Sequence, residues 1–286
     1  MYYGSIEAGG TKFVCAVGDS DFNIVERVSF PTTIPDETLA RAFEFFDKHE
    51  LKAIGIGSFG PIDVNLASET YGYVTTTPKP LWADYNFLGT VKDRYNVPVG
   101  WTTDVNAAAL GEQSLGAAKG LSSCLYLTVG TGVGGGAVVN GELLSGYSHP
   151  EMGHIMVRPH PEDYFEGVCP FHKHCLEGLA SGAAIEKRFS IKANKLDKSH
   201  AAWKFEAYYI AQAIMSYALI LSPEKIIIGG GVMNQDHLYE RIRKELVQIM
   251  AGYVILPKLL DYIVAPALGN NSATIGCFML AKRATK

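Results

Sequence analysis

The sequence lacks any segment that would direct it to or across a membrane. Its first lysine is residue 12, so no basic segment precedes an apolar stretch at the N-terminus, and a signal peptide is not expected. The longest nearly apolar run, residues 210–221, is too short to span a bilayer. Positive charge is also scarce, because 25 lysines and arginines face 29 acidic residues for a net charge of −4. We therefore expect a cytoplasmic protein with neither a nucleic acid nor a membrane as partner.

Cysteine is too scarce for a disulfide framework. Five cysteines occur in 286 residues, and a chain of this length does not need disulfides for stability. Three of them lie singly in apolar runs, where a free cysteine acts as a small hydrophobic residue. The other two, Cys169 and Cys175, share a segment with His172 and His174.

Glycine, by contrast, is abundant, with 30 of 286 residues, and many glycines gather in two similar hairpins. Residues 2–18 have the pattern of two strands joined by a turn at Gly9-Gly10-Thr11. Residues 123–144 have the pattern of two strands joined by a glycine-rich turn at 130–136. Each hairpin opens one half of a chain whose length suits two domains. We therefore predict two similar halves with a ligand cleft between them.

The rest of each half alternates helical and strand-like patterns. The patterns predict helices over 38–49, 104–119, 183–189, 201–221, 236–250 and 271–286, and strands over 51–57, 97–103 and 225–232. This alternation indicates an α/β fold with mixed sheets. Antiparallel strands are expected at the start of each half and parallel strands after them.

The glycine loops do not fit the common nucleotide-binding motifs. Residues 55–60 and 130–135 contain the letters GxGxxG, but neither leads from a strand into a helix, and no GxxxxGK[ST] occurs. A glycine hairpin can instead present backbone N–H groups and a threonine hydroxyl to an anion. A tight turn alone would explain one such loop. Two loops at equivalent places, one of them followed by Lys12, favour a nucleoside triphosphate in the cleft.

Four motifs together resemble the repressor/ORF/kinase (ROK) sugar kinases. They are Glu7–Lys12 (EAGGTK), Thr103–Ala108 (TDVNAA), Thr128–Gly136 (TVGTGVGGG) and Glu151–His154 (EMGH), in the order and spacing of that family. The resemblance extends over nearly the whole chain and is greatest to bacterial fructokinases. It implies a two-domain hexokinase/actin-like ATPase fold, with residues 1–115 plus a C-terminal helix at about 271–286 in one domain and residues 116–270 in the other. It also implies a homodimer.

The same resemblance implies ATP-dependent phosphorylation of a hexose with ATP and Mg²⁺. D-fructose, converted to fructose 6-phosphate, is the first expectation, and glucose, mannose or another hexose are the alternatives. The family also contains sugar-responsive regulators without kinase activity. These carry an N-terminal helix-turn-helix domain, which we do not expect here, because Glu7 already belongs to the first hairpin.

Asp104 is the expected catalytic residue. From the residue pattern alone, an aspartate that opens an alanine-rich helix is expected to be its N-cap. The resemblance instead matches Asp104 to the family's general base, which accepts the proton of the attacking sugar hydroxyl.

The resemblance also assigns the binding residues. The expected sugar-binding residues are Thr103, Asn106, Glu151, His154 and Glu177. The expected nucleotide-binding residues are Gly9, Gly10, Thr11, Lys12, Thr131, Gly132, Ala180, Gly229, Gly230, Gly231, Val232 and Asn271. Without the family, an exposed loop charge would be the better explanation of each of the glutamates. Glu7 and Thr103 stand where the family usually has Asp and Asn, so a contact of Glu7 with Mg²⁺ and a sugar contact of Thr103 stay open.

Cys169-x-x-His172-x-x-Cys175 has the spacing of metal ligands, and His154 could supply a fourth. Four nitrogen and sulfur ligands would complete a tetrahedral, structural Zn²⁺ site, with His174 as the competitor of His172. The alternative is a solvated, histidine-rich loop with two unpaired thiols. A zinc ion here would join Glu151 to the loop that carries Glu177, and so shape the sugar pocket without taking part in the chemistry.

Overall fold

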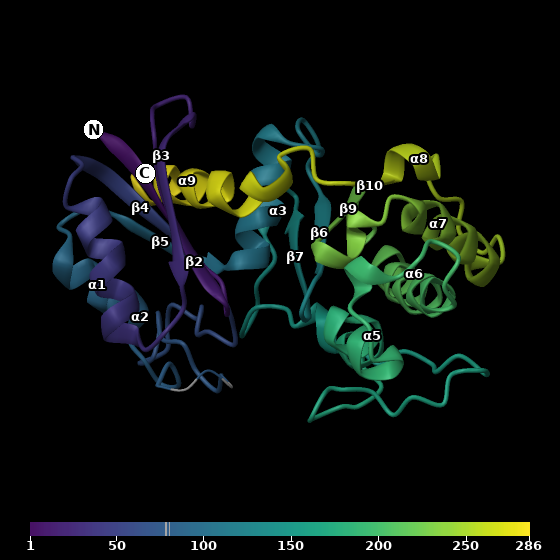
Figure 1. Ribbon diagram of the computed structural model, residues 1–286. Helices are drawn as coiled ribbons and strands as arrows, with labels where there is room; N and C mark the ends of the chain where they lie inside the picture. The colour runs from purple at the N-terminus through teal and green to yellow at the C-terminus, as the bar shows by residue number, and fades with distance from the viewer. Residues whose placement is uncertain (78, 80) are drawn as a thin grey trace.

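The computed structural model describes residues 1–77, 79 and 81–286, and over these residues it contains two five-stranded sheets (Figure 1). The first sheet has the spatial order β3 (Ile24–Pro31), β2 (Lys12–Gly18), β1 (Tyr2–Ala8), β4 (Leu51–Ser58) and β5 (Val99–Thr103). The second has the order β8 (Glu142–Leu143), β7 (Val133–Val139), β6 (Cys124–Val129), β9 (Lys225–Gly229) and β10 (Ile263–Val264).

The two sheets have the same connectivity. In each, the first strand of its half pairs antiparallel with the second strand and parallel with the fourth. The third strand extends the antiparallel side, and the fifth extends the parallel side. The predicted α/β class, the mixed sheets and the repeated plan of the two halves are confirmed.

Helices cover both faces of each sheet. In the first half, α1 (Pro35–Phe46) and α2 (Phe87–Arg94) share one core with the sheet, and α9 (Ser272–Ala284) packs on the opposite face. In the second half, α6 (Ala202–Leu221) and α7 (His237–Met250) cover one face. Helix α3 (Asp104–Leu115) covers the other. Because α3 also packs against α9, these two helices form the layer between the sheets (Figure 1). The predicted division at residue 115 therefore falls at the end of a helix that contacts both halves, and it stays a prediction.

Helix α6 is the longest helix of the second half and is apolar on nearly all sides, because it lies between the sheet, α4 (Leu176–Ala180) and α7. Helix α7 is amphipathic and buries Leu238, Ile242, Leu246 and Met250, which recur at a helical spacing. Among the described residues, no helix combines the length and the hydropathy needed to cross a bilayer.

Glycines allow α3 to approach its neighbours closely. A Cβ atom on Gly136 of β7 would lie 2.5 Å from the backbone carbonyl of Val105, and a Cβ on Gly276 of α9 would overlap the backbone of Ala107. The first turn of α3 therefore lies directly on β7 and α9, where a larger residue could not fit. This packing fixes the position of Asp104, the first residue of the helix.

Four predicted boundaries were wrong. The helix predicted over 38–49 is α1, which begins at Pro35 and ends at Phe46. Residues 133–136 belong to β7 and not to the turn, because Gly136 is needed in the strand for the contact with α3. The helix predicted to reach residue 119 ends at Leu115, since Gly116 leaves the helical conformation and the Glu112 side chain accepts a hydrogen bond from Ala117 N at 2.7 Å. The strand predicted over 225–232 ends at Gly229, because Gly230 has a φ of 95°.

Candidate active site

A cavity of about 950 Å³ lies between the two halves of the molecule. Glu7, Lys12 and Arg27 line it from the first sheet, and Asp104 lines it from the start of α3. The second half contributes the glycines at residues 229–231 and Tyr239. The volume lies within the range of cavities that bind cofactor-sized ligands. The predicted cleft between two similar halves is therefore present.

The first glycine hairpin reaches the cavity through Lys12. Its turn is closed by a hydrogen bond from Gly9 N to Lys12 O of 3.0 Å, and Thr11 and Lys12 are exposed. Among the described residues, the cavity lining includes Lys12 but not Gly9, Gly10 or Thr11, which directly precede it in the sequence.

The second glycine hairpin is held by Glu177 and Gly182, which follow the loop that carries Cys169 and Cys175. Gly182 N, at the start of α5 (Gly182–Phe189), donates a hydrogen bond of 2.7 Å to Gly130 O. The Glu177 carboxylate accepts one of 3.0 Å from Val133 N. Thr131 is exposed at the tip of this hairpin. Thr131 and Gly132 lie outside the described lining of the cavity.

The other predicted nucleotide-binding residues divide into three groups. Gly229, Gly230 and Gly231 line the cavity. The side chains of Ala180 and Val232 are buried in the core, so only their backbone atoms could meet a ligand. The Asn271 side chain accepts a hydrogen bond of 2.8 Å from Arg27, which joins β3 to the start of α9 at the edge of the cavity.

Asp104 is not the N-cap of its helix, contrary to the prediction from the residue pattern alone. Thr103 takes that position, and its hydroxyl accepts a hydrogen bond of 3.2 Å from Asn106 N. Asp104 is the first helical residue, and one of its carboxylate oxygens accepts a hydrogen bond of 2.8 Å from Val105 N. The threonine hydroxyl satisfies the helix terminus, so the aspartate carboxylate remains at the wall of the cavity.

The carboxylates around Asp104 disfavour its ionised form. Burial, together with the negative charges of Glu7 and Glu151, raises the pKa of Asp104 to about 7. Burial also raises the pKa of Glu7, opposed by a hydrogen bond from Thr274 and by the positive charges of Arg27 and Lys12. A carboxylate such as Glu7, beside a second acidic group in a polar cavity, fits the oxygen ligands that Mg²⁺ prefers.

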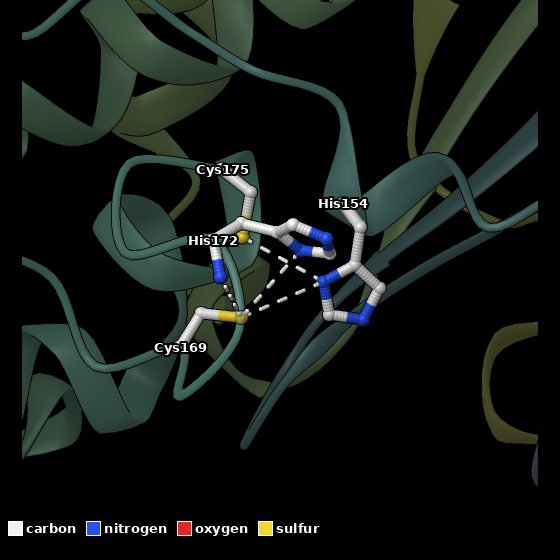
Figure 2. Close-up of side chains that lie close together, drawn as sticks. All are labelled: His154, Cys169, His172 and Cys175. Carbon is white, nitrogen blue, oxygen red and sulfur yellow. Dashed lines mark hydrogen bonds between the residues drawn. The ribbon is translucent and has the colours of Figure 1, made fainter. Parts of the chain in front are cut away.

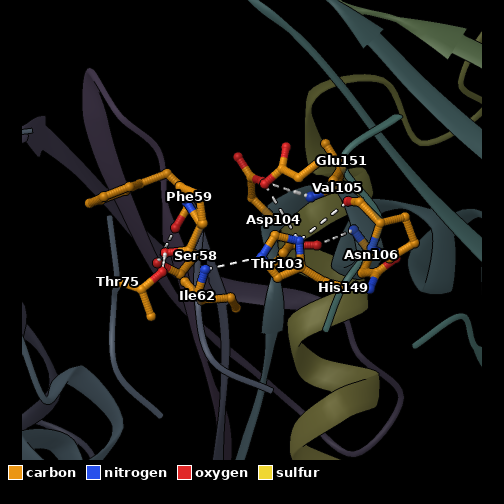
Figure 3. A network of polar contacts seen from close by, with 12 residues as sticks. Ser58, Phe59, Ile62, Thr75, Thr103, Asp104, Val105, Asn106, His149 and Glu151 are labelled. Atoms are coloured by element: carbon orange, nitrogen blue, oxygen red, sulfur yellow. Dashed lines mark hydrogen bonds and ion pairs between the residues drawn. The ribbon is translucent and has the colours of Figure 1, made fainter. Parts of the chain in front are cut away.

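The predicted sugar-binding residues also divide into two groups. Glu151 is exposed overall, but burial of its carboxylate raises its pKa. The charge of His154 lowers that pKa and the charge of Glu177 raises it, so these three side chains lie near one another. In Figure 3 the carboxylates of Asp104 and Glu151 point to the same side. Asn106 is 2% exposed, and its amide bonds Thr102 and the backbone of Ala137.

The hydroxyl of Thr103 is likewise engaged, as the helix cap. The described lining of the cavity includes none of the five predicted sugar-binding residues, since Glu151, His154 and Glu177 are absent from it as well as Thr103 and Asn106. A sugar contact of all five residues therefore stays a prediction. The observed hydrogen bonds of Thr103 and Asn106 hold the start of α3 against β5 and β7.

The predicted metal ligands come together in one cluster (Figure 2). The ligand atoms of His154, Cys169, His172 and Cys175 lie within 4.8 Å of one another. His154 Nδ1 lies 3.6 Å from Cys175 Sγ and 3.8 Å from Cys169 Sγ, and His172 Nδ1 lies 3.8 Å from Cys169 Sγ. Tetrahedral zinc with bonds of about 2.3 Å to sulfur and about 2.0–2.1 Å to nitrogen would place such pairs about 3.6 Å apart. The donor set and its spacing therefore fit Zn²⁺, with His172 in the cluster.

The cluster is connected to the predicted sugar residues at both ends. His154 ends the short 3₁₀ helix Met152–His154, which begins directly after Glu151. Cys175 caps α4, where its sulfur accepts a hydrogen bond of 3.4 Å from Gly178 N, and Glu177 is in the first turn of that helix. A metal ion at the cluster would thus fix the distance between the two glutamates.

Sequence reasoning missed part of the cavity. Arg27 comes from β3, a strand that the sequence pattern did not predict, because its exposed charged residues hide the alternation. Tyr126 and Tyr239 line the other side and belong to predicted elements without having been recognised as site residues. No local motif marks these three positions.

The chain is similar over nearly its whole length to proteins of one known family. The model of the ROK family matches residues 3–284. A fructokinase of Streptococcus mutans is 48% identical over 98% of this chain and 97% of its own length, and a fructokinase of Pediococcus pentosaceus is 46% identical over 100% and 99%. The crystal structure of a ROK hexokinase from Thermus thermophilus superimposes with a TM-score of 0.81 at 26% identity, covering 100% of this chain and 99% of that chain.

Proposed function

The chain belongs to the ROK family, and we propose that it is an ATP-dependent hexose kinase that converts D-fructose to fructose 6-phosphate, with Asp104 as the general base. The observation that carries the proposal is the position of Asp104 on the wall of a cavity that both halves line, in a chain similar over its whole length to fructokinases. The same position of Asp104 favours a kinase over a sugar-responsive regulator without activity.

Asp104 would take the proton from the 6-hydroxyl of the sugar. The hydroxyl oxygen forms a bond to the γ-phosphorus, the bond from that phosphorus to the β–γ bridging oxygen breaks, and ADP leaves. A base is most effective when its pKa lies near the working pH, and the raised pKa of Asp104, about 7, suits this role. The remaining requirement is the alignment of the hydroxyl with the phosphate.

The phosphates would lie between the two glycine hairpins. Lys12 and Arg27 bring positive charge to the cavity, and the hairpin turns at Gly9–Thr11 and Thr131–Gly132 offer backbone N–H groups from opposite halves. The adenosine would lie along Gly229–Gly231, where the absence of side chains lets the backbone approach it. When bound, Mg²⁺ would neutralise charge on the transferred phosphate, and Glu7, which lines the cavity, would hold it.

The sugar hydroxyls would be bound by Glu151 and Glu177, with His154 next to them. Carboxylates accept several hydrogen bonds in one plane, which suits neighbouring hydroxyl groups. We further propose that His154, Cys169, His172 and Cys175 hold a structural Zn²⁺ that fixes these two glutamates. The homodimer implied by the family resemblance also stays a prediction.

A panel of hexoses tests the proposed function. In an assay that couples ADP release to a spectroscopic signal, with Mg-ATP saturating, we expect fructose to give the highest kcat/KM. Glucose, mannose and an amino sugar serve as the comparison substrates. If glucose exceeds fructose tenfold, the specificity is wrong and the kinase assignment stands. If no hexose releases ADP above the background, the kinase assignment is wrong.

The pH dependence of the reaction tests the role of Asp104. At subsaturating concentrations of both substrates the rate reports the ionisation of the free enzyme. Since burial raises the pKa of Asp104 to about 7 and only the ionised form accepts a proton, kcat/KM should fall about tenfold per pH unit below that value. A rate that is constant from pH 8 to pH 5 would contradict this, provided that the protein is shown to stay folded at pH 5.

A further inference from the structure

His149 joins the two halves of the molecule beside the proposed sugar site (Figure 3). Its side chain is 2% exposed, and its Nε2 accepts a hydrogen bond of 3.0 Å from the backbone N–H of Ile62. Ile62 follows β4 of the first sheet, whereas His149 precedes the segment that carries Glu151. One imidazole therefore connects the backbone of one half to the sugar-binding segment of the other.

The hydrogen bond from Ile62 fixes the tautomer of the ring. An Nε2 atom that accepts carries no proton, so the neutral ring carries its proton on Nδ1. Nδ1 lies 3.3 Å from Pro150 O and 3.6 Å from the nearer carboxylate oxygen of Glu151. Its proton is thus donated to the Pro150 carbonyl, with the Glu151 carboxylate next to it beyond hydrogen-bond distance, and both ring nitrogens have hydrogen-bond partners.

The segment that His149 contacts is itself tied to the first glycine hairpin. Phe59 N donates a hydrogen bond of 2.7 Å to Ala8 O, at the point where β1 enters the turn. Gly60 lies so close to the other half that a Cβ there would be 3.2 Å from both the Glu151 carboxylate and the His149 ring. A continuous series of contacts therefore runs from the hairpin at Ala8, through Phe59 and Ile62, to His149 and Glu151.

We propose that His149 is a positioning residue for the sugar site, which fixes the Glu151 carboxylate relative to the phosphate-binding hairpin and to Asp104. The inference rests on the proposed function, because it takes Glu151 as a sugar ligand. His149 does not touch the reacting atoms. It acts by holding one sugar ligand in register with the half of the molecule that binds the phosphates, and its loss should weaken sugar binding more than nucleotide binding.

Two substitutions separate the contacts of the two ring nitrogens. His149→Ala removes the contacts of Nε2 and of Nδ1. His149→Gln can place its amide oxygen near the position of Nε2 and so keep the acceptor for Ile62 N. We expect His149→Ala to raise the KM for fructose at least tenfold and to change the KM for Mg-ATP by less than twofold. His149→Gln should recover part of that loss. Isothermal titration with fructose gives the affinity independently of turnover.

Two further variants keep the test decisive if His149→Ala folds poorly. Gly60→Ala leaves both side chains in place but presses a methyl group against them, and it should also raise the KM for fructose. His200→Gln is the matched control, because its ring lies at the start of α6, where it accepts a hydrogen bond from Ala202 N. It should leave both KM values unchanged.

The outcomes distinguish this inference from the proposed function. If wild-type protein phosphorylates no hexose, the proposed function fails first. If wild type is active and His149→Ala binds fructose with unchanged affinity, the positioning role is refuted. An equal rise in both KM values, or a lower melting temperature without a change in the KM for fructose, would also refute it, because either result indicates a general structural role.

Discussion

Asp104→Asn is expected to lower kcat by about 10²–10⁴-fold, the range typical for the loss of a general base. Asparagine has nearly the same shape as aspartate but cannot accept the proton of the sugar hydroxyl. The cap of α3 is Thr103, so the substitution leaves the helix terminus satisfied. Fructose binding, measured by titration, should change little, because the expected sugar ligands Glu151 and Glu177 are on other segments and Thr103 and Asn106 are unchanged.

The same variant has a second expected result, on stability. The pKa of Asp104 is raised from 3.8 to about 7 in the folded protein, so folding disfavours the ionised side chain. The protonated side chain contributes to the stability of the folded state at low pH. This contribution is lost as the pH rises through about 7. The uncharged variant should therefore melt at a higher temperature than wild type at pH 8, while at pH 4 the difference should nearly vanish.

The control for Asp104→Asn is Asp93→Asn, an exposed aspartate on α2, which should retain both the activity and the melting temperature of wild type. Retention of wild-type kcat by Asp104→Asn would remove this residue from the mechanism. A loss of fructose binding in a folded variant would instead make Asp104 a sugar ligand and not a base.

Removal of the metal from the cluster at His154, Cys169, His172 and Cys175 is expected to destabilise the folded protein strongly. A ligand present at about 1,000 times its Kd stabilises the folded state by about 4 kcal/mol. At about 2–4 °C per kcal/mol for a protein of this size, a strong chelator should lower the melting temperature by roughly 10 °C. Burial raises the pKa of Cys175 to about 11, so without a cation its thiol stays protonated at neutral pH.

Metal loss should also weaken sugar binding. Glu151 and Glu177 lie on either side of the cluster, so release of the loop loosens both carboxylates together. We expect the KM for fructose to rise at least tenfold after chelation, with a smaller change in kcat, and to recover when Zn²⁺ is added back. The KM for Mg-ATP should change least.

Two histidines of the same loop, His172 and His174, provide a variant and its matched control. His172 belongs to the cluster and His174 does not, although both share the loop with Cys169 and Cys175. Metal analysis should find about one zinc per chain in His174→Asn and much less in His172→Asn. Stoichiometric zinc in His172→Asn, or a wild-type protein purified without chelator that contains no zinc, would contradict the proposed site.

The structure also shows where reasoning from the residue pattern was incomplete. Aspartate is among the best capping residues, so the residue pattern predicts Asp104 as the N-cap of its helix. The neighbouring threonine takes that place because β5 runs directly into the helix and leaves the Thr103 hydroxyl within reach of Asn106 N. Two adjacent capping residues cannot be ranked by preference alone, since the direction of the incoming strand decides which of them caps.

The sequence by itself determined the features that depend on neighbouring residues. The strand pattern and the glycines define both hairpins, the apolar periodicity defines the major helices, and the short spacing of Cys169, His172 and Cys175 restricts them to one loop. These features depend on backbone dihedrals and on side-chain period, which a short segment encodes completely.

Tertiary structure decided which distant residues share a site. The placement of α3 and α9 between the sheets brought Arg27 to the cavity, and the approach of the two halves joined Ile62 to His149. It also put His172 and not His174 in the metal cluster. Such contacts depend on how sheets and helices pack over the whole chain, and the residues that form them leave no local pattern, because their partners are far away in the sequence.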